Sequence, residues 1–381
     1  MAGISSIRIC IVSPSIYPLF NPMAHGLFQD AELQLYEMAR FFGGDPRIEV
    51  NVLTGDYGQD DVEFSAGALV FRGEFDVRQN FMERLFHKKT PLQNLLAKID
   101  ADIYVMAGAS GLARPVADFC RTNNRSFLFR IVEHRDCDGT FVYGDPEGES
   151  YRWALHQADV ILCQTEEQKK LLQRTEHLAA VRVPNLVRLQ PPSDALRTDV
   201  LWIGEAVEWR QPELFYRLAL TIPHQNFTLL TRPDNPDYFE RLVSKTRDVP
   251  NLGFENSVPY HEWPILMQRA RLLVNTSRYE GFPFSFSLAF ASSVPVASLN
   301  IDPDGMLEKK QLGICAHGSE VHLAQGVADI ISYPRQWKRF SDNAYQFARN
   351  ELNPETAVES YRKVFVHCVV KRRRKKAKRG Q

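Results

Sequence analysis

Short runs of apolar residues alternate along the chain with segments of helical periodicity. Most of the apolar runs are continuous, as expected of parallel strands that helices cover on both faces. Between the first two runs, Ala31, Leu35, Met38 and Phe42 recur on one helical face, and Asp30 stands where an N-cap is expected. This order predicts a Rossmann-like domain. Its strands are expected at 7–14, 48–55, 102–109, 126–133 and 158–165.

The pattern is interrupted at 183–199, where paired prolines, Ser and Asp favour a linker. It then resumes with apolar runs and helical segments, which predicts a second α/β domain. We therefore expect two doubly wound domains that face each other across a cleft, at 1–190 and 197–350. Ligands of such sheets bind beyond the carboxyl ends of the strands. The strands of the second domain are expected at 199–205, 227–231, 271–277 and 295–299.

The chain is helical in pattern after about residue 335. Asn353 and Pro354 suit the start of the last helix, as a cap followed by a proline at the first helical position. The apolar stripe of this helix predicts that one face is buried. The stripe consists of Ala357, Tyr361, Val364 and Cys368.

The charge of the chain is unevenly distributed. The composition, 44% hydrophobic and 24% charged, is typical of a globular protein, and the formal net charge is zero. The segment 371–381 holds eight of the 46 basic residues and none of the 46 acidic ones, so the rest of the chain carries about −8. We expect a disordered tail held near anionic lipid or a polyanionic partner, with a merely solubilising tail as the alternative. Nucleic acid is an unlikely partner, because the tail has no interleaved aromatic residues.

Six cysteines are scattered without any metal-binding spacing, and most lie in apolar runs, where a thiol behaves as a small hydrophobe. This usage indicates a reducing compartment. The N-terminus has no signal-peptide pattern, and no window approaches the roughly 18 apolar residues of a spanning helix. We expect a cytoplasmic protein that touches the inner face of the membrane through its basic tail.

One acidic residue, Glu280, stands at the start of an apolar segment directly after the expected strand 271–277. Pro283 suits the first position of the next helix, whose first N–H groups would attract an anion. Gly281 lets the backbone approach a ligand closely. A carboxylate beside an anion site is suited to accept hydrogen bonds from sugar hydroxyls. A solvated glutamate before a proline turn is an equal alternative.

The segment YEGFPFSFSLAFASSVPVAS (279–298) resembles the E-G-F-P…G-x-P-V-V-A segment of retaining glycosyltransferases of the GT-B fold, family 4 or group 1. DVLWIGEAVEWRQPELF (199–215) is similar to the strand–Gly–Arg–x4–Lys element of that family, and AELQLYEMARFF and ADVILCQTEEQKKLL resemble elements of its first domain. The resemblance implies sugar transfer from a nucleotide-sugar donor to a carbohydrate or lipid-linked acceptor, with retention of configuration. It also implies no metal, no cofactor, and a last helix (353–370) that packs back on the first domain.

The resemblance implies roles for individual residues. Glu280 would bind hydroxyls of the donor sugar, and Arg210 would replace a lysine that neutralises the diphosphate, with Gly204 as the turn beside it. His134 matches a first-domain histidine near the donor sugar, although a loop histidine is an equal alternative. The backbone of Gly281, Phe282, Pro283 and Phe284 would contact sugar and phosphate. Asp304 and Gly305 could line the same cleft, or form an ordinary Asp-Gly turn.

Three positions depart from the pattern of the family. Leu288 replaces a glutamate that grips the ribose, and losing a charged hydrogen bond of roughly 1.5–3 kcal/mol would weaken nucleotide binding about ten- to a hundredfold. Glu205 replaces a phosphate-binding arginine. Gln29-Asp30 replaces a Gly-Gly loop, with Gly26 nearby as a substitute. These departures keep two alternatives open: a catalytically inactive binding or partner subunit of the same fold, and a nucleotide-sugar epimerase.

The triplet Asp136-Cys137-Asp138 has the Asp-x-Asp form found in metal-dependent, single-domain glycosyltransferases. It lies in the middle of the strand–helix series of the first domain. We interpret it as a chance pair and expect no metal site.

Overall fold

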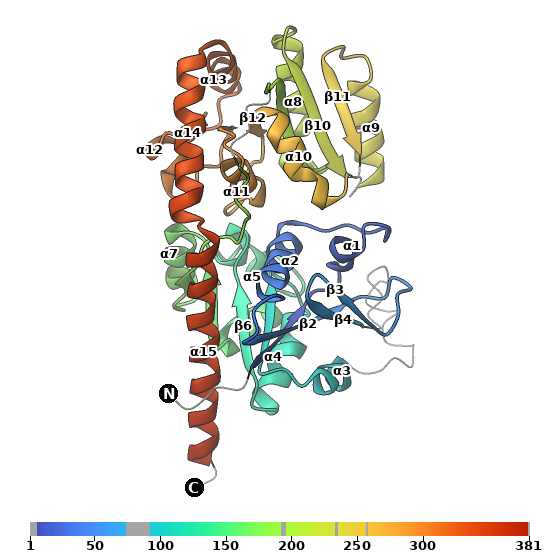
Figure 1. Ribbon diagram of the computed structural model, residues 1–381, viewed down its shortest axis with the longest axis vertical. Helices are drawn as coiled ribbons and strands as arrows, with labels where there is room; N and C mark the ends of the chain where they lie inside the picture. Colours follow the sequence, from blue (N-terminus) through green and yellow to red (C-terminus); the bar gives the residue numbers. More distant parts are fainter. Residues whose placement is uncertain (1–5, 74–91, 192–195, 233–234, 257, 380–381) are drawn as a thin grey trace. The chain divides into compact units, whose positions relative to one another are not determined.

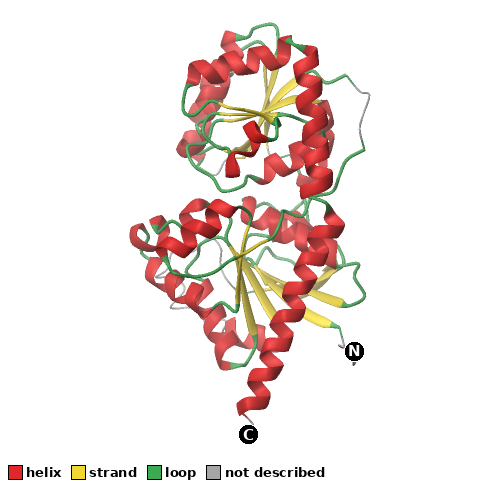
Figure 2. Cartoon of the chain, turned by 90° about the vertical axis from the view of Figure 1, so that its left-hand side faces the viewer, coloured by secondary structure: helices red, strands yellow, loops and turns green. Residues whose placement is uncertain are grey.

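The computed structural model describes residues 6–73, 92–191, 196–232, 235–256 and 258–379. The chain divides into two compact units, Met1–Leu186 together with Glu355–Gln381, and Val187–Pro354. In each unit, helices cover a central sheet (Figures 1 and 2). The boundary at residues 186 and 187 falls inside the segment 183–199 that the sequence marks as a linker.

The first unit contains an eight-stranded sheet with the order β3-β4-β2-β1-β5-β6-β7-β8. All neighbouring strands are parallel except β3 and β4, which form an antiparallel hairpin at one edge. The five strands expected from the sequence are confirmed, and β3, β4 and β8 are additions. The strands are β1 (Ile7–Val12), β2 (Ile48–Thr54), β3 (Val62–Ser65), β4 (Ala68–Arg72), β5 (Ile103–Ala107), β6 (Ser126–Arg130), β7 (Val160–Cys163) and β8 (Val181–Arg182).

Helix α2 carries the apolar face that the sequence predicts, but its cap is one residue earlier. The helix begins at Asp30, and Gln29 is the N-cap, so the expectation of Asp30 as the cap is wrong by one position. The side chain of Glu32 accepts a hydrogen bond from the Gln29 backbone N–H at 2.8 Å, which completes a capping box. The helices of this unit are α1 (Tyr17–Phe20), α2 (Asp30–Phe42), α3 (Leu92–Ile99), α4 (Ala113–Thr122), α5 (Thr140–Gly144), α6 (Gly148–Gln157) and α7 (Glu166–Thr175).

The last helix, α15 (Pro354–Arg379), packs against the first unit (Figure 1). The predicted apolar stripe is buried, with Ala357 and Cys368 fully enclosed. The stripe residue Tyr361 accepts a hydrogen bond from Arg130 at the end of β6, and Arg362 pairs with Asp45 at 2.7 Å. The helix continues through residues 371–379, so the expectation of a disordered tail is wrong for them.

The second unit contains a six-stranded parallel sheet with the order β11-β10-β9-β12-β13-β14. Numbered along the chain, this is the order 3-2-1-4-5-6 of a Rossmann fold. The four expected strands are confirmed, and β11 and β14 are additions. The strands are β9 (Asp199–Glu205), β10 (Asn226–Arg232), β11 (Leu252–Asn256), β12 (Ala270–Asn275), β13 (Val296–Ser298) and β14 (Gly313–Cys315).

Seven helices among the described residues of this unit connect the strands or follow them. Helix α11 is buried along its whole length because it has no polar face, and it packs between α10 and α14. The helices are α8 (Pro212–Thr221), α9 (Pro236–Thr246), α10 (Trp263–Arg269), α11 (Phe284–Ala291), α12 (Met306–Lys309), α13 (Glu320–Ser332) and α14 (Pro334–Glu351).

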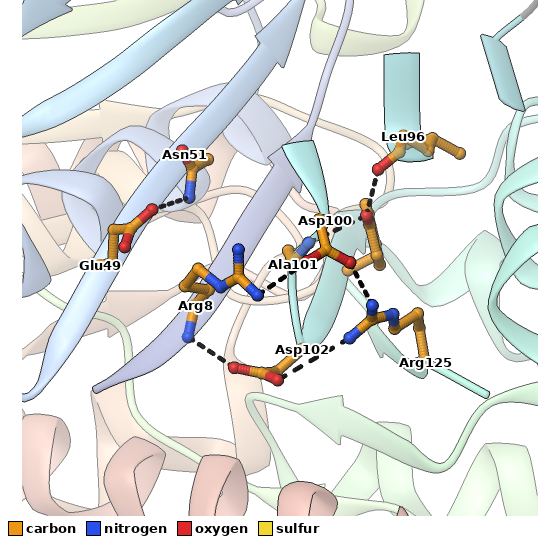
Figure 3. A network of polar contacts seen from close by, with 9 residues as sticks. Arg8, Glu49, Asn51, Leu96, Asp100, Ala101, Asp102 and Arg125 are labelled. Atoms are coloured by element: carbon orange, nitrogen blue, oxygen red, sulfur yellow. Dashed lines mark hydrogen bonds and ion pairs between the residues drawn. The ribbon is translucent and has the colours of Figure 1, made fainter. Parts of the chain in front are cut away.

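A network of charged residues joins the amino ends of three strands in the first unit (Figure 3). Arg8 at the start of β1 pairs with Asp100 at 2.9 Å, and its backbone N–H donates to Asp102 at 2.9 Å. Arg125, which precedes β6, pairs with Asp100 as well. These half-buried side chains pair with one another. We therefore assign a structural role to this edge of the sheet.

Three further findings concern the residues that the structure describes. All six cysteines are buried and unpaired with one another, as their apolar surroundings predict. Within the described residues, none of the helices has the length and apolar character needed to span a bilayer. In the same part of the chain, no three His, Cys, Asp or Glu side chains are placed to hold a metal ion.

Candidate functional site

The order of the second sheet reverses between β9 and β12, which are neighbours in space. The chain leaves β9 toward α8 and leaves β12 toward α11, so the two loops begin side by side at the carboxyl edge. Arg210 lies in the first loop and Glu280 in the second. Their side chains meet, with 3.0 Å between Arg210 Nη1 and Glu280 Oε2. The structure therefore brings together the two residues that the sequence singles out, at the point where ligands of such sheets bind.

The pair is part of a larger buried network. Glu205, the last residue of β9, approaches Arg210 Nε at 2.5 Å through Oε2. The other oxygen of Glu205 pairs with Arg232 Nη2 at 3.0 Å. Asn275 Nδ2 donates a hydrogen bond to Glu280 Oε1 at 2.8 Å. Each of these five residues is less than one-tenth exposed, so their charges interact in a medium that screens them poorly.

Glu205 is ionised in this network. Burial alone would raise the pKa of its carboxyl group, but the neighbouring guanidinium groups of Arg210 and Arg232 outweigh burial and hold the pKa below its usual value. The two arginines and the two glutamates, Glu205 and Glu280, sum to zero charge. Removing one member would leave an uncompensated buried charge, which typically costs about 3–5 kcal/mol.

The backbone of Arg210 is fixed from β9 and β12. Thr276 donates its hydroxyl to the Arg210 carbonyl oxygen at 2.7 Å, and Trp202 Nε1 donates to the Thr276 hydroxyl at 2.9 Å. The guanidinium carbon of Arg210 also lies 4.4 Å from the centre of the Trp209 ring. These contacts preorganise the arginine before any ligand arrives.

Gly204 is required by the side chain of Arg210. A Cβ atom at this position would lie 2.9 Å from Arg210 Cδ and 2.8 Å from Trp202 Cη2, which is too close for either contact. Gly204 lies within β9, so the expectation of a turn is wrong. The absence of a side chain here lets the aliphatic part of Arg210 lie across the end of the strand.

The segment after Glu280 is buried, including Gly281, Phe282, Pro283 and Phe284. Helix α11 begins at Phe284, and Pro283 is its N-cap rather than its first residue, which corrects the expected position by one residue. Leu288, which stands at the position of the second family acid, is 2% exposed inside this helix. The site therefore has no carboxylate at that position.

Asp304 and Gly305 form the turn that the alternative reading expects. Both have left-handed backbone conformations, with φ of 54° and 71°. The Lys309 ammonium donates to the Asp304 carbonyl oxygen at 2.6 Å, which closes the turn from α12.

His134 belongs to the first unit, in a short 3₁₀-helix (His134–Asp136) that follows β6. Its Nε2 atom lies 3.6 Å from Glu167 Oε2 on α7. The neighbouring Asp136 accepts hydrogen bonds from the backbone N–H groups of Ala109, Val132 and Glu133. The Asp136 carboxylate therefore stabilises the backbone of the loop. This role agrees with the interpretation that the Asp-x-Asp form of 136–138 arose by chance.

The expected Gly-Gly loop falls on Gln29 and Asp30, where Gln29 and the nearby Gly26 are exposed. Gln29 caps α2, as described above, and a Cβ atom on Gly26 would meet Pro18 Cγ at 2.7 Å and Tyr57 Cε1 at 2.9 Å. The absence of a side chain at Gly26 therefore makes room for Pro18 and Tyr57 of the same unit.

Sequence reasoning missed Arg232, Asn275 and Thr276. Arg232 ends the apolar strand FTLLTR, and Asn275 and Thr276 end RLLVNT. Polar residues at the carboxyl ends of parallel strands are the signal that could have identified all three, because such ends share one edge of the sheet.

Comparison with known proteins identifies the type of fold. Neither a family model nor a curated protein sequence matches this chain. Among solved structures, sucrose-phosphate synthase from Thermosynechococcus elongatus is similar with a TM-score of 0.74 and 16% identity, over 95% of this chain and all of that one. The pneumococcal O-GlcNAc transferase GtfA, in complex with UDP and GlcNAc, has a TM-score of 0.68 and 9% identity, over 96% and 99% of the two chains.

A glycosyltransferase from Rickettsia africae ESF-5 is similar to the same extent, with a TM-score of 0.66 and 12% identity over 96% of this chain and 99% of that one. At such identities the likeness establishes architecture rather than activity. Two parallel α/β sheets and a long C-terminal helix on the first unit agree with it. The chain therefore has the GT-B fold.

Proposed function

We propose that this protein transfers a sugar from a nucleotide-sugar donor to a carbohydrate or glycolipid acceptor, with retention of configuration at the anomeric carbon. The observation that carries the proposal is the buried pair of Arg210 and Glu280 at the switch point of the second sheet. The likeness to sucrose-phosphate synthase and to GtfA, which holds UDP and GlcNAc, favours a nucleotide-sugar donor.

Arg210 is the residue that stabilises the departing diphosphate. A guanidinium presents its donors in a planar fork that matches phosphate oxygens, and its contacts with Glu205 and Trp209 hold that fork in place. The positive end of α11 begins four residues after Glu280 and adds to the favourable potential for an anion. Catalysis then comes from positioning and from charge stabilisation without a metal.

Glu280 is the residue that orients the donor sugar. Both of its oxygens have protein partners, since Oε1 accepts from Asn275 and Oε2 pairs with Arg210. A carboxylate has about four lone-pair sites, so each oxygen can accept a further hydrogen bond from a sugar hydroxyl. The pairing with Arg210 holds the carboxylate in place while it does so.

The main competing function is a binding or partner subunit that has the fold but not the activity. It is favoured by Leu288, a buried apolar residue where the related pattern has a ribose-binding acid. In that case the ion pair of Arg210 and Glu280 serves only to join two loops.

Nucleotide titration separates the two functions. UDP, GDP and ADP are added in turn while thermal unfolding is monitored, and a nucleotide present at a hundred times its dissociation constant should add about 2.7 kcal/mol of stability. We expect a shift with one of the three. No shift with any of them would favour the inactive subunit.

Sugar transfer itself is tested with the corresponding nucleotide sugars and a panel of carbohydrate and glycolipid acceptors. Glu280→Ala and Arg210→Ala should abolish transfer, and the anomeric configuration of the product should match that of the donor. Arg217→Ala and Glu320→Ala are matched controls, because these residues form an exposed ion pair in the same unit, at 3.3 Å. Unchanged transfer in both site variants would exclude the roles assigned here.

The basic end of α15 supports a second part of the proposal, in which the protein works in the cytoplasm at the inner face of the membrane. Lys371 and Arg372 pair with Asp159 of the first unit, which fixes the start of the basic segment to the body of the protein. Anionic lipid attracts basic residues near its surface, at about 1 kcal/mol for each one. A lipid-linked acceptor would be met at that surface.

A further inference from the structure

Four buried charged residues lie in a row along the carboxyl edge of the second sheet. Arg232 ends β10 and Glu205 ends β9, and the two are register partners in these parallel strands. The other two follow β9 and β12, and the three strands are neighbours in the order β10-β9-β12. The signs alternate along the row, which runs Arg232, Glu205, Arg210, Glu280.

The carboxylate of Glu205 holds two guanidinium groups at once. Oε2 approaches Arg210 at 2.5 Å and Oε1 pairs with Arg232 at 3.0 Å. Two guanidinium groups that reach the two oxygens of one carboxylate are close enough to serve adjacent groups of one larger anion. A diphosphate is such an anion, because it presents two phosphoryl groups joined by a single bridging oxygen.

The plane of the second guanidinium is supported from another element. The guanidinium carbon of Arg232 lies 5.8 Å from the centre of the Trp263 ring, at the start of α10. Arg232 is 8% exposed, and its contacts with Glu205 and Trp263 restrain the side chain. Arg210 is supported in the same way by Trp209. Each arginine of the row thus has a carboxylate on one side and an indole ring to pack on.

Stability alone does not explain the row. Apolar residues of similar volume usually stabilise a protein as well as a buried ion pair does, or better. The row also lies at the edge of the sheet where ligands bind, not at the opposite edge. A buried arginine at this edge is therefore better explained by an anionic ligand than by the fold.

We propose that Arg232 is a second phosphate-binding residue of the donor site, and that Glu205 is a positioning residue that aims Arg232 and Arg210 at one diphosphate. The inference rests on the proposed function and deepens it, because it names the part of the donor that is bound. The ligand class is a nucleoside diphosphate, bound more tightly than the corresponding monophosphate because two arginines meet two phosphoryl groups.

The test compares Arg232→Gln with the matched control Arg271→Gln. Arg271 also lies beside a tryptophan, 5.5 Å from the centre of the Trp337 ring, but it stands at the start of β12, on the opposite edge of the sheet. Dissociation constants are measured by calorimetry for the nucleoside diphosphate and monophosphate of the base that the unmodified protein prefers. Arg232→Gln should weaken diphosphate binding at least tenfold and reduce the preference for diphosphate over monophosphate. Arg271→Gln should change neither.

The outcomes distinguish this inference from the proposed function. If the unmodified protein binds no nucleotide, the proposed function fails and the inference fails with it. If Arg210→Gln weakens diphosphate binding while Arg232→Gln stays within twofold of the unmodified protein, only the inference fails. Equal weakening of monophosphate and diphosphate binding by Arg232→Gln would mean a structural role and would also overturn it.

A second pair of variants covers the case in which Arg232→Gln does not fold. The double variant Glu205→Gln/Arg232→Gln removes both charges of the pair, so no charge of that pair is left uncompensated. Its diphosphate affinity is compared with that of the unmodified protein. We expect the double variant to bind at least tenfold more weakly, and equal affinities would overturn the inference.

Discussion

Trp209 and Tyr279 stack with their ring centroids 5.1 Å apart and their planes inclined by 16°. Each ring directly precedes a member of the buried ion pair, Arg210 in one loop and Glu280 in the other. The ion pair therefore joins the two loops in the buried interior. The stacked rings join them nearer to solvent, where Tyr279 is 43% exposed. A third link is the backbone N–H of Arg278, which donates to the Trp209 carbonyl oxygen at 2.9 Å.

The first prediction concerns the stacked rings. Tyr279→Ala should destabilise the second unit by about 0.5–1.5 kcal/mol through loss of the ring pair, in addition to the loss of its buried area. The double variant with Trp209→Ala should be less destabilised than the sum of the two single variants, because the pair is lost in each of them. Urea unfolding of the four proteins measures this coupling.

The control for this cycle is Tyr333→Ala, which removes an exposed tyrosine that is 58% accessible and lies between α13 and α14 in the same unit. It should cost less than Tyr279→Ala. Additive effects of Tyr279→Ala and Trp209→Ala would contradict an energetic role for the stack.

The second prediction concerns Glu205 and pH. The folded-state pKa of this carboxyl group is held below its unfolded value by Arg210 and Arg232, against the opposing effect of burial. Its contribution to stability is thus present above the unfolded pKa, about 4.3, and is lost as the pH falls through the folded-state pKa. Glu205→Gln should cost about 3–5 kcal/mol at pH 7, because two buried cations lose their shared counterion.

The difference between Glu205→Gln and the unmodified protein should shrink as the pH falls below 4, because the unmodified carboxyl group then becomes protonated as well. Urea unfolding at a series of pH values measures it. Glu320→Gln, at an exposed ion pair, should show little difference at any pH. A cost of Glu205→Gln that stays constant from pH 7 to pH 3 would show that the carboxylate charge is not what stabilises the network.

The third prediction concerns Gly204. Gly204→Ala would place a methyl group 2.9 Å from Arg210 Cδ, so the arginine must move and its fork must lose its alignment. We expect nucleotide binding to weaken about tenfold, roughly the effect of one charged hydrogen bond. Gly253→Ala is the matched control, because it lies in β11 of the same sheet and its Cβ would meet only ordinary contacts of 3.7 Å and longer. Equal affinities of the two alanine variants would exclude a role for the close approach.

Much of the fold could be predicted because buried parallel strands are continuous apolar runs. The sequence predicts strand β9 at 199–205, and the structure has it at Asp199–Glu205. The hairpin of β3 and β4 was missed because it lies at an edge of the sheet, where Phe64 is 75% exposed and the apolar pattern is weak. Strand β14 was missed because it is short and begins with Gly313, so only two side chains mark it as a strand.

The candidate site was predictable only in part. Glu280 and Arg210 were identified because the segments 279–298 and 199–215 each resemble a segment of the glycosyltransferase family. Their contact with each other depends on the neighbouring positions of β9 and β12, which a linear pattern does not encode. The same is true of Glu205, whose sequence position suggests a lost phosphate contact. In three dimensions Glu205 lies between Arg210 and Arg232 and pairs with both, so its carboxylate orients the two guanidinium groups.

The last prediction concerns the basic end of α15. Two of its eight basic residues, Lys371 and Arg372, already pair with Asp159, so deletion of 373–381 removes the other six and leaves these contacts in place. If the segment holds the protein at anionic lipid, the deletion should abolish co-sedimentation with vesicles of phosphatidylserine and phosphatidylcholine at low salt. Binding of the full chain should fall as salt rises, because the charges are screened.

Vesicles of phosphatidylcholine alone are the control, and neither protein should bind them. The double variant Lys371→Gln/Arg372→Gln is a second control, which keeps six basic residues and should retain most of the binding to anionic vesicles. Each basic residue near such a surface contributes about 1 kcal/mol of binding free energy, so the six remaining residues contribute more than the two that are replaced. Equal binding of the full chain and the truncated chain to anionic vesicles would place any membrane contact elsewhere on the protein.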